Sequence, residues 1–325
     1  MCVSVAPAEF SGTILYVGRR EHPDFGPIEV LGYQNTAVNL TTGPNAMLLH
    51  LPALAMTRAN FLDTTSSPDV LRDLVDALSP ASRGTAAYGA VAAGPPPAVE
   101  VFDHDVYTVV LAADPRDIPA ALDRVPEHKR PRLRPELFTF YAEVFPDYPV
   151  ALCCFDNADA RRAAPLLMWY RPVYLDRLIA PALDCHTGEA PEPNGWVRPD
   201  HWVVFGIDDV PGEWGSPVTY RQPPGPLAAF LPERVIGRAV QEGPVRNGDF
   251  VLGLQDARAE RIEALARLTP NGERVSLDTA PLPEPVVPGP ETPTRSGPAW
   301  LKPLLLSVVV ALFLVSCFIF LVWGP

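Results

Sequence analysis

The 20 residues at positions 304–323 constrain this chain more than any other feature. They include no charged residue, and Ser307 and Ser316 are their only hydroxyl-bearing members. At a rise of ~1.5 Å per residue, a helix of this length spans ~30 Å, the thickness of the hydrocarbon core of a bilayer. A helix at the surface of a soluble domain keeps one polar stripe facing water, and this segment has none. The sequence therefore predicts a transmembrane helix over residues 304–323.

The residues beside this segment predict its orientation. Trp300 and Trp323 bracket it, and indole rings favour the membrane interface. Arg295 and Lys302 lie on its N-terminal side, and a positive flank favours the cytosol. The first residues show neither the basic n-region nor the apolar h-region of a secretory signal. We therefore expect a tail-anchored, single-pass membrane protein whose N-terminal domain lies in the cytoplasm and whose C-terminal helix contacts the lipid bilayer.

Composition changes abruptly before the apolar segment. Seven of the 24 residues at 277–300 are proline, and large apolar residues are sparse there. Proline-rich chains adopt extended polyproline structure at ~3.1 Å per residue, so residues 277–300 are expected to form a semi-rigid linker. A shorter stretch rich in proline and alanine, residues 79–97, is typical of an exposed loop. The sequence therefore predicts one globular domain over residues 1–276, a linker and an anchor.

Net charge and cysteine content exclude several classes of protein. The formal net charge is −12, which repels phosphate backbones and anionic lipid surfaces and disfavours a nucleic-acid partner. The five cysteines form no CxxC pair and no spacing typical of a zinc site or a disulfide framework. Cys153 and Cys154 are adjacent in an apolar run, so on a strand they point to opposite faces as buried apolar side chains.

Hydrophobic periodicity predicts an α+β domain with mixed or antiparallel sheets and a few helices. Short β-forming runs occur at residues 3–6, 13–17, 28–31, 45–52, 107–111, 150–155, 166–170, 202–207 and 250–254. Helical spacing is expected from Pro68 to Leu78 behind a Ser67 cap, and at residues 118–124, 135–145 and 257–268, the last with a Glu263–Arg267 pair. The strands do not alternate regularly with helices, which favours α+β over a doubly wound parallel sheet.

The middle of the chain resembles an uncharacterised bacterial family of unknown function. The residues that carry the resemblance are the run NAMLLHLPA from Asn45, TVVLAADP from Thr108, PVALCCF from Pro149 and APLLMWYRP, which ends at Pro172. Members of that family usually combine a secretion signal with a C-terminal membrane span, and this chain matches only the second feature. The resemblance implies a bacterial origin and brings no reaction, cofactor or catalytic residue.

Cys2 is a candidate nucleophile. It follows the initiator methionine directly, so removal of Met1 exposes an N-terminal cysteine whose own α-amine can act as base. The alternative is an inert or lipid-modified terminal residue, because no oxyanion-hole or triad motif accompanies it.

A second candidate is the pair of carboxylates Asp103 and Asp105. On a strand they lie on one face, ~6.6 Å apart along the chain, with His104 on the other face. Two carboxylates so placed can bind a hard cation or act as acid and base. A turn rich in aspartate at the end of a strand is the alternative reading of the same residues.

A third candidate is a metal site. Asp184 and His186 can share a face, and His201, which follows Asp200, can complete a two-histidine, one-carboxylate set for a divalent metal. Histidines hydrogen-bonded in loops are the alternative. His50 has no evident partner in the sequence, and the same is true of His22 and His128.

Other motifs are few. The basic cluster at residues 126–134 could bind a phosphate or an acidic partner, or form a solvated loop. The sequence contains no Walker A loop, GxGxxG turn, HExxH, GxSxG or kinase set. Two hypotheses follow: a non-enzymatic domain that binds a protein partner, and a membrane-tethered hydrolase or metal-dependent enzyme that uses Cys2 or the Asp and His sets. Convergence of those residues in one pocket discriminates between them.

Overall fold

A computed structural model describes residues 3–79, 98–156, 163–222, 224–241 and 243–277. The described residues all belong to one compact unit. Cys2, most of the loop predicted at 79–97, the linker and the predicted helix at 304–323 lie outside the described residues. Within the described ranges, no helix has the length and apolar character needed to cross a membrane.

The compact unit is built mainly from strands. The strands are β1 (Val3–Ser4), β2 (Ala8–His22), β3 (Gly26–Asn39), β4 (Asn45–His50), β5 (Phe61–Leu62), β6 (Val99–His104), β7 (Tyr107–Ala112), β8 (Val150–Phe155), β9 (Leu166–Tyr170), β10 (Arg177–Ala180), β11 (Trp196–Val197), β12 (His201–Ile207), β13 (Ser216–Pro217), β14 (Arg234–Val240), β15 (Val245–Arg246), β16 (Asp249–Gly253), β17 (Ala266–Leu268) and β18 (Arg274–Ser276). The α-helices are α1 (Val70–Ala77), α2 (Ile118–Ala121), α3 (Pro135–Val144) and α4 (Leu254–Arg258). The 3-10 helices are η1 (Arg58–Asn60), η2 (Pro115–Asp117), η3 (Leu122–Arg124), η4 (Glu127–Lys129), η6 (Gly225–Phe230) and η7 (Ile262–Ala264).

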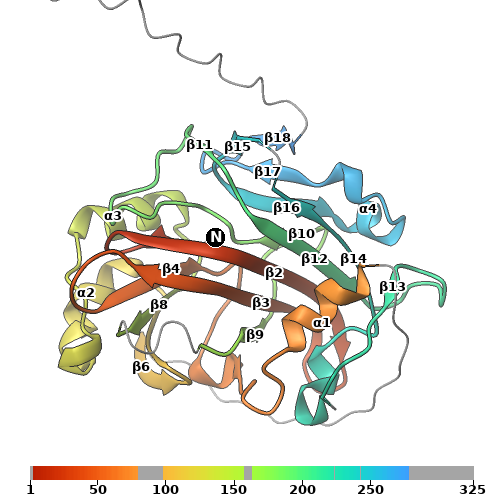
Figure 1. The fold of residues 1–325 in the computed structure, drawn as a ribbon, viewed down its shortest axis with the longest axis horizontal. Coiled ribbons are helices and arrows are strands. Elements are labelled where there is room, and N and C mark those ends of the chain that lie inside the picture. Colours follow the sequence, from red (N-terminus) through yellow and green to blue (C-terminus); the bar gives the residue numbers. More distant parts are fainter. Residues whose placement is uncertain (1–2, 80–97, 157–162, 223, 242, 278–325) are drawn as a thin grey trace, which may run out of the picture. The chain divides into compact units, whose positions relative to one another are not determined.

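The largest sheet has seven strands in the order β13-β14-β12-β2-β3-β9-β5. Its centre is the long hairpin of β2 and β3, which crosses the front of Figure 1. All of its pairs are antiparallel except β12 with β2. The hairpin register shifts between Ser11 and Ile14, at a bulge that contains Gly12 with φ 62°. Glycine adopts this left-handed conformation without the steric cost that other residues meet.

Three smaller sheets complete the unit. Five antiparallel strands run in the order β1-β4-β8-β7-β6, four run in the order β10-β16-β17-β18, and β11 pairs with β15. The predicted α+β class, with mixed and antiparallel sheets and a few helices, is therefore confirmed for the described residues.

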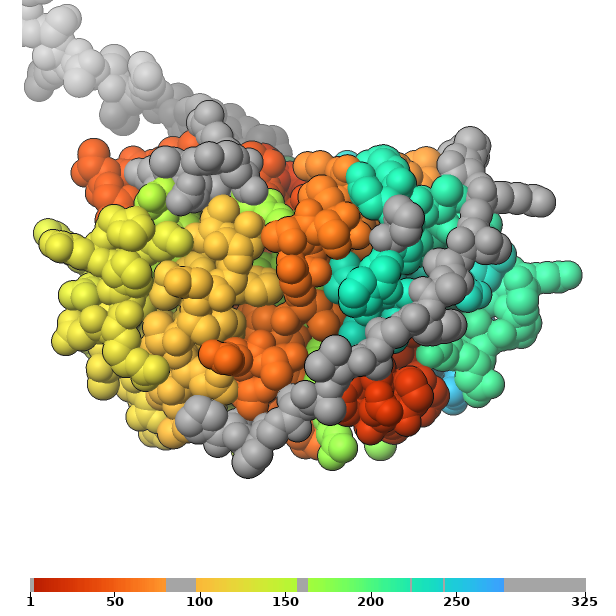
Figure 2. Space-filling view, turned by 90° about the horizontal axis from the view of Figure 1, so that it is seen from below, coloured from red at the N-terminus to blue at the C-terminus, as the bar shows by residue number. Residues whose placement is uncertain are grey.

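The strands bury both faces, so the unit is layered. On the seven-stranded sheet, Tyr16 faces α1 and η6, whereas its neighbours Leu15 and Val17 face the five-stranded and four-stranded sheets. The outer face of the five-stranded sheet is covered by α2 and α3, whose Ile118 and Leu137 are fully buried there. Figure 2 shows the yellow residues of the α2–α3 region at one end of the face it displays and teal residues of the 200–240 region at the other.

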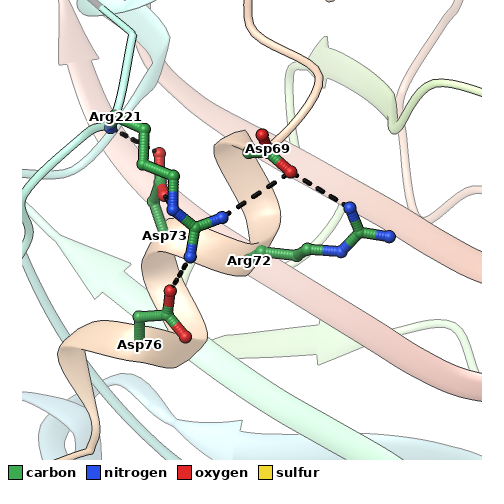
Figure 3. A network of polar contacts seen from close by, with 5 residues as sticks. All are labelled: Asp69, Arg72, Asp73, Asp76 and Arg221. Atoms are coloured by element: carbon green, nitrogen blue, oxygen red, sulfur yellow. Dashed lines mark hydrogen bonds and ion pairs between the residues drawn. The ribbon is translucent and has the colours of Figure 1, made fainter.

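One arginine, Arg221, connects helix α1 to the segment after β13. Asp69, Asp73 and Asp76 recur at helical spacing, so their carboxylates share one side of the helix. Figure 3 shows Arg221, from the segment after β13, directed at all three of them. The side chain of Asp73 is buried, and its Oδ2 also accepts a hydrogen bond from the backbone N–H of Arg221 at 3.0 Å. The three acidic residues are therefore part of a clamp between α1 and the 220 segment.

Several sequence predictions match the structure closely. The strands expected at 150–155 and 166–170 are β8 and β9 with the same bounds. The helix expected from Pro68 to Leu78 is α1, which begins two residues later, and the helix expected at 135–145 is α3. Cys153 and Cys154 are both buried and belong to hydrophobic clusters on opposite faces of β8, as expected.

The helix predicted at 257–268 is wrong. Helix α4 ends at Arg258, and Glu260 then adopts φ 56°, a left-handed conformation that stops the helix. Residues 262–264 form a 3-10 turn, and Arg267 lies in strand β17, fully buried. The expected Glu263–Arg267 pair along one helix face therefore does not form.

Candidate functional site

The residues of the predicted metal site form two contacts in the structure. His186 Nε2 lies 2.9 Å from Asp184 Oδ1, so these two side chains contact each other directly. His201 Nδ1 lies 3.5 Å from Oδ1 of its neighbour Asp200. Burial lowers the pKa of His201 to about 3, so its imidazole is neutral at physiological pH. In the described part of the chain, we find no group of three or more His, Cys, Asp or Glu arranged to hold a metal ion.

The expected geometry of Asp103 and Asp105 is wrong. Strand β6 ends at His104, so only Asp103 lies on the strand, where its Oδ1 accepts a hydrogen bond from the Thr108 hydroxyl at 2.7 Å. Asp105 lies in the tight turn to β7 with φ 50°, and its carboxylate accepts the backbone N–H of Ala164 at 2.7 Å. A turn needs a residue that tolerates the left-handed region, and aspartate does so better than most. The alternative reading, an aspartate-rich turn, fits this geometry.

The basic cluster at 126–134 is used in part for contacts within the domain. Lys129 donates to the Val106 carbonyl at 2.7 Å, and Arg130 donates to the Val125 carbonyl at 2.9 Å. Arg134 pairs with Glu189 at 3.3 Å on the surface.

The structure brings together a pair that the sequence did not indicate. His50, the last residue of β4, places Nε2 at 2.8 Å from Oδ2 of Asp249, the first residue of β16, 199 positions away. Both side chains are buried, with exposed fractions of 3% and 4%. The His50 ring stacks on Phe145 with a centroid separation of 4.0 Å and an interplanar angle of 16°.

Asp249 is held as a carboxylate in the interior. Burial alone would raise its pKa, but His50 and the backbone N–H of Ala182 outweigh burial and hold the pKa below its usual range. Oδ1 accepts the N–H groups of Ala182 and Leu183 at 2.9 and 3.2 Å. The fully buried Arg267 lies on the interior side, where burial lowers its pKa to about 10 while Asp249 and Asp184 act in the opposite direction.

A pocket of about 270 Å³ lies beside Asp249. Its walls are the end of α3 with the following turn (residues 144–148), Tyr174 and the turn between β17 and β18 (residues 268–272), and Asp249 contributes to its lining. The one aliphatic hydroxyl among the lining residues is that of Thr269, which accepts the Glu273 N–H at 3.1 Å. The pocket therefore offers carboxylates and aromatic rings as binding groups, and within the described lining it offers no serine or cysteine nucleophile.

Beside the pocket, the loop between β9 and β10 (residues 171–176, the β9–β10 loop) carries large apolar side chains in solvent. Tyr174 and Leu175 are 37% and 64% exposed. Leu54, on the adjoining segment after β4, is 66% exposed, and its N–H donates to the Arg171 carbonyl at 2.9 Å. We call Leu54, Tyr174 and Leu175 the apolar loop surface.

The β9–β10 loop is held in place from below by Arg19. Its guanidinium donates to the carbonyls of Tyr174, Leu175 and Arg177 at 2.9, 3.1 and 3.1 Å, and pairs with Glu29 on the next strand. Besides the bond from Leu54 N–H to the Arg171 carbonyl, the backbone adds two more, from Val173 N–H to the Pro52 carbonyl and from Leu254 N–H to the Asp176 carbonyl. The exposed apolar side chains therefore stand on an anchored backbone.

No protein-family model and no curated protein matches this chain. Among solved structures, it is similar to baculovirus P35 with 14% identity and a TM-score of 0.37, over 63% of this chain and 67% of that one. A mutated baculovirus P35 after caspase cleavage gives 15% identity and a TM-score of 0.36, over 62% of this chain and 68% of that one. These TM-scores are too low to bring a function to this chain.

Proposed function

We propose that this chain is a membrane-anchored protein-binding domain, which docks a protein partner on the apolar loop surface. The single observation that supports the proposal most is the combination of exposure and rigidity at Leu54, Tyr174 and Leu175. The membrane attachment and the cytoplasmic position of the domain rest on the sequence of residues 295–323.

Exposed leucines and tyrosines gain free energy when a partner covers them. Burial of apolar surface contributes ~25 cal/mol per Å², and aromatic anchors tend to dominate the energy of an interface. A single exposed apolar residue needs no explanation, whereas three on two adjoining, hydrogen-bonded segments offer apolar surface to one partner.

Rigidity makes such a patch effective. A flexible loop loses conformational entropy when a partner orders it, and that loss reduces the affinity. Here the Arg19 guanidinium and three main-chain bonds already fix the backbone of the β9–β10 loop. Most of the ordering therefore occurs during folding rather than during binding.

Site-specific photo-crosslinking tests the proposal. A photo-reactive amino acid is placed at position 54 or 175 of the full chain, in the cells that produce it, and adducts are resolved by mass. Leu40 is the matched control, because it is 57% exposed but lies after β3, outside the apolar loop surface. Positions 54 and 175 should give the same discrete protein adduct, and position 40 should not.

A second substitution makes the result specific. Leu175→Asp should abolish the adduct formed from position 54, because a carboxylate cannot be buried in an apolar contact without a large desolvation cost. The proposal is contradicted if positions 54 and 175 give no discrete adduct, or if all three positions give the same set.

A further inference from the structure

We infer that the partner presents an arginine side chain and that the pocket beside the β9–β10 loop receives its guanidinium. The inference rests on the proposed function, because it names the chemistry of the segment that docks on the apolar loop surface. It is argued from the charge, the rings and the position of the pocket.

The lining of the pocket is acidic. Two of its side chains are carboxylates, Asp147 and Asp249, and none of the described residues that line it is Lys, Arg or His. Asp147 is exposed, and no hydrogen bond or ion pair links it to another described residue. His50 and Arg267 approach Asp249 but are not part of the lining, and the Asp249 oxygens already accept from His50, Ala182 and Leu183. A cationic group that enters the pocket therefore meets the exposed carboxylate of Asp147 as its ion-pair partner, with the buried Asp249 behind it.

Helix α3 adds to this preference for a cation. Its last residue, Val144, and the following Phe145 belong to the wall of the pocket. The C-terminal end of a helix carries partial negative charge on its unsatisfied carbonyls, and basic side chains are favourable there. The last turn of α3 contains no basic residue of its own.

The aromatic lining selects a guanidinium over an ammonium. Phe145, Tyr148 and Tyr174 all line the pocket, and a planar guanidinium can stack on a ring while its N–H groups bind a carboxylate. One face of the Tyr174 ring already makes such a contact within the protein, because the Arg177 guanidinium lies 5.1 Å from the ring centre while it pairs with Asp176 at 2.7 Å, so the partner's guanidinium is expected on the other face. At about 270 Å³ the pocket is below the ~300–1,000 Å³ typical for drug-sized ligands, which suits one side chain.

Tyr174 connects the pocket to the apolar loop surface. It is a member of both, so a peptide segment that covers Leu175 has its neighbouring residues within reach of the pocket. The partner segment is therefore expected to combine an apolar residue with an arginine close to it.

The test uses a free probe, so that it does not depend on the partner. N-acetyl-arginine amide and its neutral isostere N-acetyl-citrulline amide are titrated into the full chain in detergent micelles, and binding is followed by saturation-transfer NMR. The arginine probe should bind with a Kd in the millimolar range, as expected for a single side chain. The citrulline probe should bind ~10-fold more weakly, because it lacks the charge that the carboxylates and rings recognise.

Two substitutions locate the binding. Asp147→Asn should weaken arginine binding about fivefold, the effect of one partly exposed ion pair. Glu136→Gln is the matched control, because it removes the same charge from the exposed first turn of the same helix and should leave binding unchanged. Tyr174→Leu should weaken binding through loss of stacking, whereas Tyr174→Phe should retain it.

Equal binding of the two probes, or an unchanged Kd for Asp147→Asn, overturns the inference. The crosslinking experiment tests the proposed function separately from the arginine inference. If positions 54 and 175 give a crosslinked adduct but the arginine probe does not bind, the proposed protein-binding function is retained and the inference of a partner arginine is rejected. If the arginine probe binds but no adduct forms, the pocket is retained as a cation-binding site and the apolar loop surface is rejected as a docking site.

Discussion

Arg19 and Glu29, on the adjacent strands β2 and β3, form a buried ion pair directly beneath the β9–β10 loop. Their closest atoms, Arg19 Nη2 and Glu29 Oε1, lie 2.5 Å apart, and the same guanidinium donates hydrogen bonds to the carbonyls of residues 174, 175 and 177. An interior charge pair thus supports an exposed surface.

Replacement of Arg19 should cost stability as well as loop order. Arg19→Met leaves the carbonyls of Tyr174, Leu175 and Arg177 without their donor and Glu29 without its counter-ion, and loss of one partner of a buried pair costs ~3–5 kcal/mol. We expect a loss of this size in the free energy of unfolding, measured by urea denaturation at pH 8, and faster hydrogen exchange at residues 173–176. A loss below ~1 kcal/mol would show that the loop does not depend on Arg19.

Glu29 should make the stability of the domain depend on pH. Burial raises its pKa to about 7 in spite of Arg19, so between pH ~4.5 and 7 the folded state holds a proton that the unfolded chain has released. The contribution of Glu29 is therefore complete at low pH and is lost as the pH rises through about 7. Relative to Glu29→Gln, the parent chain should lose up to ~3 kcal/mol of unfolding free energy between pH 5 and 8. The prediction is contradicted if the free energies of unfolding of the two proteins change with pH in parallel.

The clamp on α1 offers a matched pair of arginines. Arg221→Met removes the guanidinium that faces the buried Asp73, and we expect a loss of ~1–2 kcal/mol in the free energy of unfolding. Arg72→Met removes one exposed pair with Asp69 and should cost less than ~0.5 kcal/mol. Denaturation of both variants at neutral pH measures the two losses in the free energy of unfolding. Equal losses would show that Arg221 contributes no more to stability than Arg72 does.

The sequence predicted those elements whose pattern is locally complete. Strands β8 and β9 are continuous apolar runs, and α1 shows helical spacing after Pro68. The long hairpin was predicted only in part, as the runs 13–17 and 28–31, because the residues that extend β2 to His22 and β3 to Asn39 are largely polar or charged, and Arg19 and Arg20 are buried despite their charge. The helix expected at 257–268 failed for the same reason, since Arg267 is a buried charge on a strand.

The candidate site could not be found in this way. His50 was set aside because no partner lies near it in the sequence, and its partner Asp249 is 199 positions away. The pocket beside Asp249 is assembled from the end of α3, Tyr174 and the β17–β18 turn, which only the folded sheets bring together. Only one local run of the sequence, FPDYP from Phe145, indicates the pocket, and it does so weakly.

The predicted anchor can be tested by truncation. The full chain should sediment with membranes, and a chain ended at Ser296 should stay in the supernatant, because the long apolar run at 304–323 is then removed. Fractionation of cells that express each form, with an immunoblot of both fractions, provides the measurement. Tight membrane attachment of the truncated chain would point to a second anchor, and acylation of Cys2 would be examined first.

The most direct measurement of the central claim is the accessibility of position 175 inside the cell. A cysteine is introduced at Leu175, and in a separate chain at Leu40, and the rate of maleimide labelling at each site is followed by peptide mass spectrometry, in cells and on purified protein. If a partner covers the apolar loop surface, Cys at 175 should react at least tenfold more slowly in cells than after purification, while Cys at 40 should react equally in both. Equal labelling of position 175 in the two settings would contradict the proposed docking surface.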